Sequence, residues 1–231
     1  MQYLISGIVS FLFSFITWSL LAQSSASTYH LEAGEVLDIL LLSQNPGSDS
    51  LFKNYGQTAF PVAARMSYES LPGFKVKELT QGNYQPGSMI LGKWQNLEKR
   101  EQFLHEIEKE VPDFHAQRRA IWPTFHLTYY EVPSTLDFTI DRKDFNVVTS
   151  LWQKEEGAFQ EYQQQWLQQV EQAGGKVVLS LKDGTSPFGY YYQPDLMTVV
   201  TWDDREAYET FVEATQKFDR RGVLHLNAFA L

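Results

Sequence analysis

The 231-residue sequence contains no cysteine. That absence excludes disulfide bonds, iron–sulfur clusters, thiolate zinc sites and a catalytic thiol. Positive charge is also scarce, because 19 Lys and Arg face 28 Asp and Glu, for a net charge of -9. Nucleic-acid partners require a basic face, so none is expected. The remaining composition, 43% hydrophobic and 15% aromatic, is typical of a folded globular chain.

Recognisable catalytic and metal-binding motifs are missing as well. No Gly-x-Ser-x-Gly nucleophile elbow and no glycine-rich phosphate loop is present. The histidines show none of the spacings that bind zinc on a helix; they are His30, His105, His115, His126 and His225. The sequence therefore predicts no metal site and no cofactor held by a standard motif.

Charged side chains are absent from residues 1–31. Within that region, residues 3–22 form an apolar run that ends in the small residues of the segment 22–27. This pattern predicts a signal peptide over residues 1–26, cleaved after Ser24 or Ala26, and hence a periplasmic or secreted protein. Because no positive charge precedes the apolar run, an uncleaved anchor is the alternative. It would hold the rest of the chain outside the cytoplasm and make the only membrane contact.

The rest of the chain is an internal repeat. Residues 84–103 and 192–211 align without gaps at an offset of 108 and share eight of 20 residues, among them Trp94 and Trp202. Chance would supply about one identity in such a window, so the alignment indicates a duplication. We place the first copy at residues 34–132, a polar linker at 133–142 and the second copy at 143–231.

Each copy is predicted to follow the order β-α-β-β-α-β. Pro61 predicts a kinked or split first helix, and Asp203 predicts the N-cap of the last one. The strands expected from apolar runs and alternation are Val36–Ser43, Phe74–Thr80, Ser88–Trp94 and Thr124–Val132 in the first copy, and Phe145–Trp152, Lys176–Lys182, Leu196–Trp202 and Val223–Leu231 in the second. This order predicts an α+β fold of two tandem ferredoxin-like units.

Two such sheets in one chain would pair face to face into a pseudo-dimeric barrel, whose interior is the expected ligand cavity. With this topology, copies of about 100 residues, and a third strand that ends in Trp202 before the segment 203–208, the chain resembles the dimeric α+β barrel superfamily. That superfamily includes the antibiotic-biosynthesis monooxygenases, the NIPSNAP proteins and muconolactone isomerases. The resemblance leaves haem open, because some of these barrels bind it through one histidine; His126 or His225 would serve.

Strand alternation selects candidate site residues. In the last strands, His225 and Asn227 are expected to face the barrel interior, as are His126 and Tyr130 in the first copy. Asp38 lies on the neighbouring first strand. An Asp38–His126 pair would orient and polarise the imidazole as a general base.

Further candidates surround this pair. Asn146, which lies 108 residues after Asp38, would fix the tautomer of His225 without adding charge. Arg119 and Arg221 belong to arginine pairs just before the last strands and could hold a carboxylate or enolate at the cavity mouth, although such pairs usually face solvent. An aromatic insertion at 186–192 would serve as a hydrophobic lid or an interaction patch.

Three classes of function remain open from the sequence. The first is an exported module that binds a small hydrophobic or aromatic molecule in the cavity between the sheets. The second is a cofactor-independent monooxygenase or isomerase, with His126 as base and Asp38 as its orienter. The third is a structural or interaction domain with no ligand, which a barrel filled by side chains would support.

Overall fold

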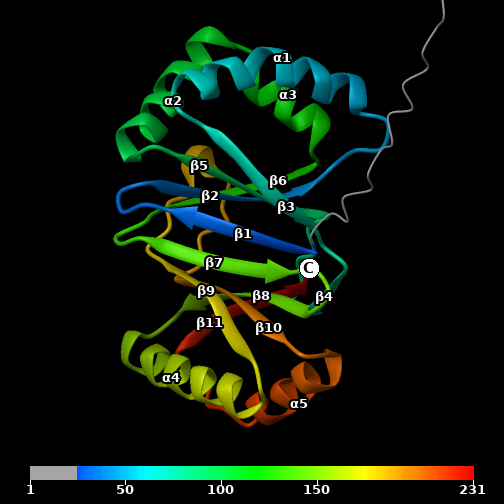
Figure 1. Cartoon of the computed structure of the whole chain (residues 1–231), viewed down its shortest axis with the longest axis vertical. Helices are drawn as coiled ribbons and strands as arrows, with labels where there is room; N and C mark the ends of the chain where they lie inside the picture. Colours follow the sequence, from blue (N-terminus) through cyan, green and yellow to red (C-terminus); the bar gives the residue numbers. More distant parts are fainter. Residues whose placement is uncertain (1–24) are drawn as a thin grey trace, which may run out of the picture.

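The computed structural model describes residues 25–231 and consists of two α/β units stacked with their sheets inward and their helices outward (Figure 1). Most of the predicted signal segment lies outside these residues. Within residues 25–231, no helix has the length and apolar character needed to cross a membrane.

Both copies adopt the ferredoxin-like strand order, which confirms the predicted fold. The first copy forms a sheet in the order β3-β5-β2-β6, and the second forms the order β9-β10-β8-β11. The elements of the first copy are β2 (Val36–Ser43), α1 (Asp49–Arg65), β3 (Glu69–Lys75), β5 (Ser88–Trp94), α2 (Leu97–Glu110), α3 (Phe114–Ile121) and β6 (Thr124–Glu131). Those of the second are β8 (Phe145–Gln153), α4 (Glu156–Gln172), β9 (Lys176–Lys182), the short turn of helix η1 (Pro187–Gly189), β10 (Leu196–Trp202), α5 (Arg205–Thr215) and β11 (Val223–Ala230).

Two local predictions differ from the structure. Helix α1 continues through Pro61 as one helix, because a proline removes only one hydrogen bond and the helix is held by its packed face. The N-cap of α5 is Asp204 and not Asp203: the Asp204 carboxylate accepts the amide of Ala207 at 2.9 Å. Asn96 caps α2 in the same way, accepting the amide of Lys99 at 2.9 Å.

The copies exchange edge segments and so close the barrel within one chain. The stretch predicted as a single strand, Phe74–Thr80, is divided between β3 and a new strand, β4 (Glu78–Gln81). Strand β4 leaves the first sheet and pairs with β11 of the second. In the other direction, Thr185 of the second copy forms a bridge with Tyr129 of β6. A single chain therefore supplies both halves of the pseudo-dimer.

A two-stranded ribbon that the sequence analysis did not predict lies between the two sheets (Figure 1). It pairs β1 (Ala26–Leu31) with β7 (Leu136–Asp141), and β7 falls within the segment 133–142 expected to be a linker. Alternation explains the strand, because Phe138 and Ile140 are buried while the residues between them face solvent. The connection between the copies thus also contributes to the core.

Side chains fill the space between the sheets. Leu37, Ile39 and Leu41 from β2 meet Val148 from β8 and Phe229 from β11 in one buried cluster. The ribbon adds its own side chains to this cluster, among them Tyr29 and Phe138, whose rings stack at 4.5 Å. The predicted ligand cavity between the sheets is therefore occupied by protein.

Candidate functional site

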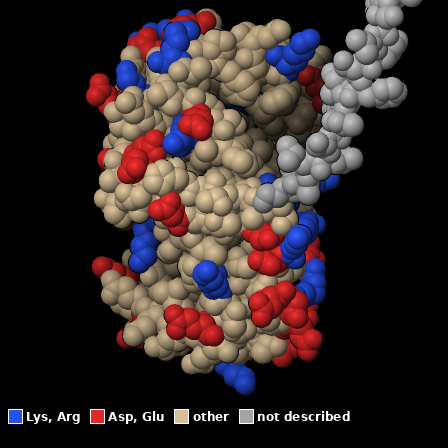
Figure 2. All heavy atoms as spheres, viewed as in Figure 1, with Lys and Arg blue, Asp and Glu red and all other residues tan. Residues whose placement is uncertain are grey.

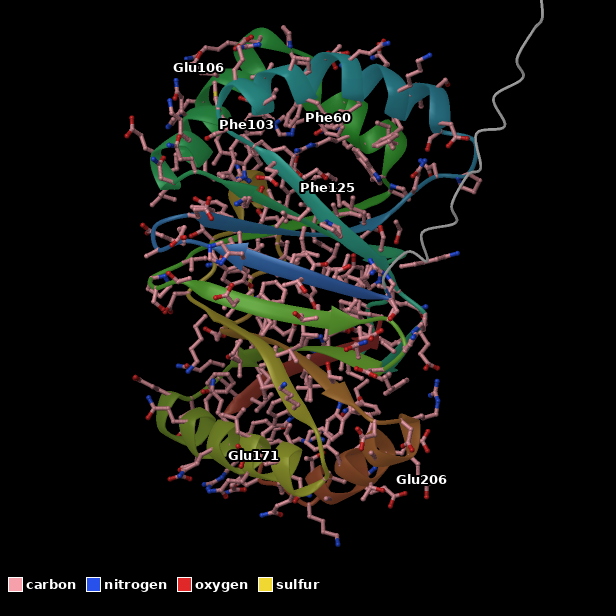
Figure 3. The ribbon with its side chains drawn as sticks, in the orientation of Figure 1. Phe60, Phe103, Glu106, Phe125, Glu171 and Glu206 are labelled. Atoms are coloured by element: carbon pink, nitrogen blue, oxygen red, sulfur yellow. The ribbon has the colours of Figure 1, made fainter. Side chains whose placement is uncertain are left out.

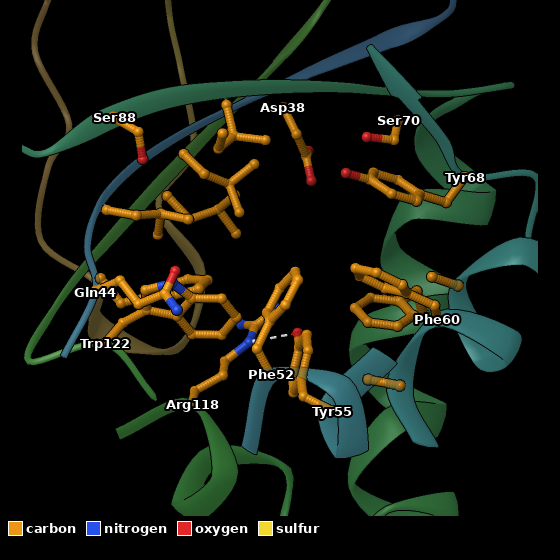
Figure 4. Close-up of a pocket in the computed structure, with 18 of the residues that line it drawn as sticks. Asp38, Gln44, Phe52, Tyr55, Phe60, Tyr68, Ser70, Ser88, Arg118 and Trp122 are labelled. Carbon is orange, nitrogen blue, oxygen red and sulfur yellow. Dashed lines mark hydrogen bonds between the residues drawn. The ribbon is translucent and has the colours of Figure 1, made fainter. Parts of the chain in front are cut away.

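A pocket of about 350 Å³ lies in the first copy, between the outer face of its sheet and the helices α1, α2 and α3 (Figure 4). Figure 2 shows the surface hollowed beneath α1 on this side of the molecule. Aromatic side chains form most of the wall, and Phe60, Phe103 and Phe125 come from three different elements around it (Figure 3). The pocket thus lies one layer away from where the sequence analysis expected it.

The pocket exists because α1 has small residues where α4 has large ones. The two helices are both 17 residues long and align at an offset of 107, which places Ala59 where the second copy has Trp166. Trp166 is buried against Phe211, with ring centroids 5.4 Å apart. Ala59 lines the pocket instead, so the volume that an indole fills in the second copy is left empty in the first.

Arg118, on α3, is the charged group at one end of the pocket. Its side chain is 7% exposed and lies between the rings of Phe114 and Phe125, at 3.9 and 4.3 Å from their centroids. Its Nε donates to Tyr55 Oη at 2.9 Å, and Nη1 donates to Tyr190 Oη at 3.0 Å. Within residues 25–231, Arg118 forms no ion pair with a carboxylate. A buried guanidinium without an anionic partner is costly, and a bound anion would remove that cost.

The aromatic insertion of the second copy supports Arg118 from behind. Tyr190 follows the short helix η1, and its hydroxyl is also 2.8 Å from Nδ1 of His115. His115 Nε2 lies 2.7 Å from a carboxylate oxygen of Glu108, which favours a proton on Nε2 and leaves Nδ1 as the acceptor for Tyr190. The insertion thus crosses to the first copy and orients the arginine there.

A buried ion pair marks a second polar region of the pocket. Arg100 Nε donates to Asp38 Oδ1 at 2.8 Å, with side-chain exposures of 1% and 5%. The guanidinium lies over Trp94 and Tyr129, at 5.0 and 4.8 Å from the ring centroids. Its Nη1 has no hydrogen-bond partner among the described residues. A buried pair with one unsatisfied donor contributes little to folding and leaves a group available to a ligand.

Tyr68 extends this second region. Its ring lies against Gly92 so closely that a Cβ at that position would approach the phenol oxygen to 2.5 Å. Gly92 is the cross-strand neighbour of Asp38, and Figure 4 shows the hydroxyl of Tyr68 turned toward that carboxylate. Burial, with a further contribution from the negative charge of Asp38, raises the pKa of Tyr68, so the phenol stays protonated.

The second copy has none of these polar groups at the matching positions. Since Trp94 pairs with Val36 and Trp202 pairs with Phe145, the register aligns Asp38 with Val147. The counterparts of Gly92 and Arg100, 108 residues later, are Val200 and Tyr208, and all three replacements are buried. The same fold forms with an apolar layer at this place, so the polar groups of the first copy are not required for folding.

The same register corrects the expectation for Asn146. It aligns with Leu37 and not with Asp38, because the first strands are related by an offset of 109. Asn146 is buried, and its Nδ2 donates to the carbonyl oxygens of Asp141 and Asp144 at 2.6 and 3.1 Å. Its Oδ1 accepts from Thr201, so it stabilises the turn before β8 and does not contact His225.

The predicted Asp38–His126 pair is not formed. In the register of β2 and β6, Asp38 lies opposite Tyr129 and His126 lies opposite Leu41. An odd separation of three positions puts the two side chains on opposite faces of the sheet. Asp38 lines the pocket, whereas His126 faces the barrel interior, where its Nδ1 lies 2.6 Å from the carbonyl oxygen of Tyr190.

His225 and Asn227 belong to the alternating set of β11 that ends in the core residue Phe229, on the barrel side as expected. The ring of His225 lies 5.0 Å from that of Trp152. Asn227 is fully buried and holds the loop after β4: Oδ1 accepts the amides of Asn83 and Tyr84, and Nδ2 donates to the carbonyl oxygen of Tyr84. These bonds use its polar atoms for structure.

Asn227→Ala is therefore expected to lower the free energy of unfolding by about 2–3 kcal/mol, because three hydrogen bonds between the copies are lost. Urea denaturation measures the change. Asn83→Ala is the matched control: Asn83 is exposed and contributes only its backbone amide, so the loss should stay below about 0.5 kcal/mol. Equal losses in the two variants would contradict this role.

The remaining candidates lie away from the pocket. Tyr130 is buried in the barrel interior, where burial raises the pKa of its phenol and no described residue bonds its hydroxyl. Arg119 is exposed on α3, and Arg221 is exposed beside Asp219. The buried arginine of the first pair is Arg118, which shares the inward face of α3 with Phe114 and Ile121 at helical spacing. Recognising residues 114–121 as a helix would have identified it.

Neither metal nor haem finds a suitable set of ligands in this pocket. No cluster of three or more metal-ligating side chains occurs in residues 25–231. No histidine lines the pocket, and the two histidines considered for haem are placed elsewhere. The ring of His126 is enclosed by Tyr84 and Tyr192 in the filled barrel interior, and His225 packs on Trp152. The residues present do not fit haem.

Comparison with known proteins yields only distant structural likeness. No protein-family profile and no curated protein sequence matches this chain. Among solved structures, an anthrone oxidase-like protein is similar at 15% identity and a TM-score of 0.47, over 87% of this chain and 94% of its own. A mutant chlorite dismutase from Candidatus Nitrospira defluvii is similar at 12% identity and a TM-score of 0.45, over 87% of this chain and 92% of its own.

Proposed function

We propose that the first copy binds a small, largely apolar organic anion in the pocket between its sheet and its helices, with the anionic group on Arg118. The observation that carries the proposal is the buried guanidinium of Arg118, which has two phenol partners and no carboxylate partner in the described chain. A carboxylate would accept its remaining N–H groups in the paired geometry that a guanidinium favours.

The pocket walls support an aromatic ligand. Phe52 and Phe60 are 41% and 46% exposed at α1, whereas Phe159, the counterpart of Phe52, is 2% exposed. The rings of Phe52 and Trp122 are 5.9 Å apart at nearly a right angle, an arrangement that receives a third ring by its edge or face. A volume of about 350 Å³ suits a molecule with one or two rings.

The proposal replaces the catalytic alternative built on His126. That base has no carboxylate orienter, and it lies on the far face of the sheet from the pocket. Binding, by contrast, requires only the wall and the unpaired charge. Export remains a prediction, which N-terminal sequencing of the mature protein would test by finding a start at Ser25 or Ser27.

Arg118→Met is expected to abolish the preference of the full-length protein for an acid over its neutral amide. In the wild type, phenylacetate should bind about 10–100-fold more tightly than phenylacetamide, because hydrogen bonds to a charged group contribute about 1.5–3 kcal/mol. Isothermal titration calorimetry measures both affinities. In the variant the two ligands should bind alike.

Arg119→Met is the matched control for this experiment. Arg119 is the next residue on α3, it is exposed, and its removal changes the net charge equally. The control should retain the preference for the acid. Equal affinity of the wild type for acid and amide, or a preference that survives in Arg118→Met, would show that Arg118 is not the anion site.

A further inference from the structure

We propose that the ligand is an elongated aromatic acid with a hydroxyl group at the end opposite its carboxylate, which the Asp38, Arg100 and Tyr68 cluster recognises. This inference rests on the proposed function, since it takes the carboxylate to lie on Arg118. It adds the chemistry of the second polar end of the same pocket.

The two ends of the pocket are set apart along one strand. Arg118 lies over Phe125 and Arg100 lies over Tyr129, each guanidinium carbon within 5 Å of the ring centroid. Phe125 and Tyr129 are four residues apart on β6 and point to the same face, a separation of about 13 Å. With a hydrogen bond of about 3 Å at each end, the polar atoms of a bridging ligand would be about 7 Å apart. A benzene ring with para substituents spans this distance.

The cluster itself is suited to a hydroxyl group. Asp38 Oδ1 accepts from Arg100, while Oδ2 accepts no hydrogen bond from residues 25–231. Arg100 Nη1 is a buried donor without a partner. A hydroxyl donates one hydrogen bond and accepts others, so it can satisfy both groups together. A cationic amine is disfavoured there, because Arg100 already neutralises the charge of Asp38.

The local backbone shows that the space for Tyr68 is built into the sheet. Gly92 leaves the hollow into which the phenol of Tyr68 fits, beside Asp38. The second copy has Val200 at the position of Gly92, and Gly175 at the position of Tyr68, where the indole of Trp202 fills the space. The donor, the acceptor and the glycine that makes room for them therefore occur together in the first copy and are replaced together in the second.

The test compares three acids on the full-length protein by calorimetry: phenylacetate, 4-hydroxyphenylacetate and 4-methoxyphenylacetate. The hydroxyl compound is expected to bind roughly tenfold more tightly than phenylacetate, because its donor reaches a buried carboxylate. The methoxy compound keeps the oxygen but lacks the donor, so it should show no gain.

Two variants locate the gain. It should fall to threefold or less in Asp38→Asn and be reduced in Tyr68→Phe, which keeps the ring and leaves the ion pair intact should Asp38→Asn fail to fold. Tyr162→Phe is the control, because Tyr162 is a buried tyrosine of the second copy whose hydroxyl has no described partner; it should keep the full gain.

The outcomes separate this inference from the proposed function. Arg118-dependent binding of phenylacetate with no gain from the hydroxyl would overturn the inference and leave the proposed function standing. A hydroxyl gain that is unchanged in both Tyr68→Phe and Asp38→Asn would also overturn it. Failure of the wild type to bind any of the three acids would count against the proposed function itself.

Discussion

Trp166→Ala should destabilise the protein by about 3–5 kcal/mol, which lowers the melting temperature by about 6–20 °C for a chain of this size. Trp166 is among the largest fully buried side chains, and it packs edge-on against Phe211 in the apolar layer under α4. Removing it leaves a cavity that the surrounding core residues can fill only in part. Chemical denaturation of the full-length protein measures the loss.

The reverse change at the matching position is the control. Ala59→Trp places an indole beside Phe103, as Trp166 stands beside Phe211, in a pocket that already has the room. It is expected to cost less than about 1.5 kcal/mol and to abolish the binding of phenylacetate. A large loss of stability in Ala59→Trp together with a small one in Trp166→Ala would contradict our account of why only the first copy contains this pocket.

Asp38→Val is expected to lower the free energy of unfolding by about 3–5 kcal/mol, because it leaves the Arg100 guanidinium buried without its counter-charge. Valine is the residue that the second copy carries at this position, so the replacement suits the strand and its packing. Thermal and urea unfolding, read by circular dichroism, give the change in stability.

The double variant Asp38→Val with Arg100→Met separates the charge from the shape. With both charges removed, most of the lost stability should return, since an apolar pair often replaces a buried ion pair at little cost. The difference between single and double variants is the coupling energy, expected at about 2–4 kcal/mol. Additive losses would show that the ion pair is not the reason for the effect.

The order of elements was predictable because it depends on local pattern. Alternation and helical spacing placed β2, β5, β9 and β10 at or near their observed bounds, and the repeat of Trp94 at Trp202 revealed the duplication. The strands that escaped prediction are β1, β4 and β7, which are short or lie in polar surroundings. Each of them is stabilised by a partner far away in the sequence, so no local signal defines it.

The candidate site was only partly predictable. Asp38 was selected from the sequence and does line the pocket, but its partner is Arg100 and not His126, because a one-residue difference in strand position changes the face on which a side chain lies. Arg118 was set aside in favour of Arg119, since the helix that buries the first and exposes the second was not recognised.

The sequence by itself determined the duplication, the ferredoxin-like order of each copy, the acidic charge and the absence of thiol and metal chemistry. Only the tertiary structure decided that the interior between the sheets is filled and that the pocket lies under α1. The physical reason is that a cavity depends on the sum of side-chain volumes from several elements. The exchange of Ala59 for Trp166 acquires its meaning only when Phe103, Arg118 and Phe125 are brought against the same face.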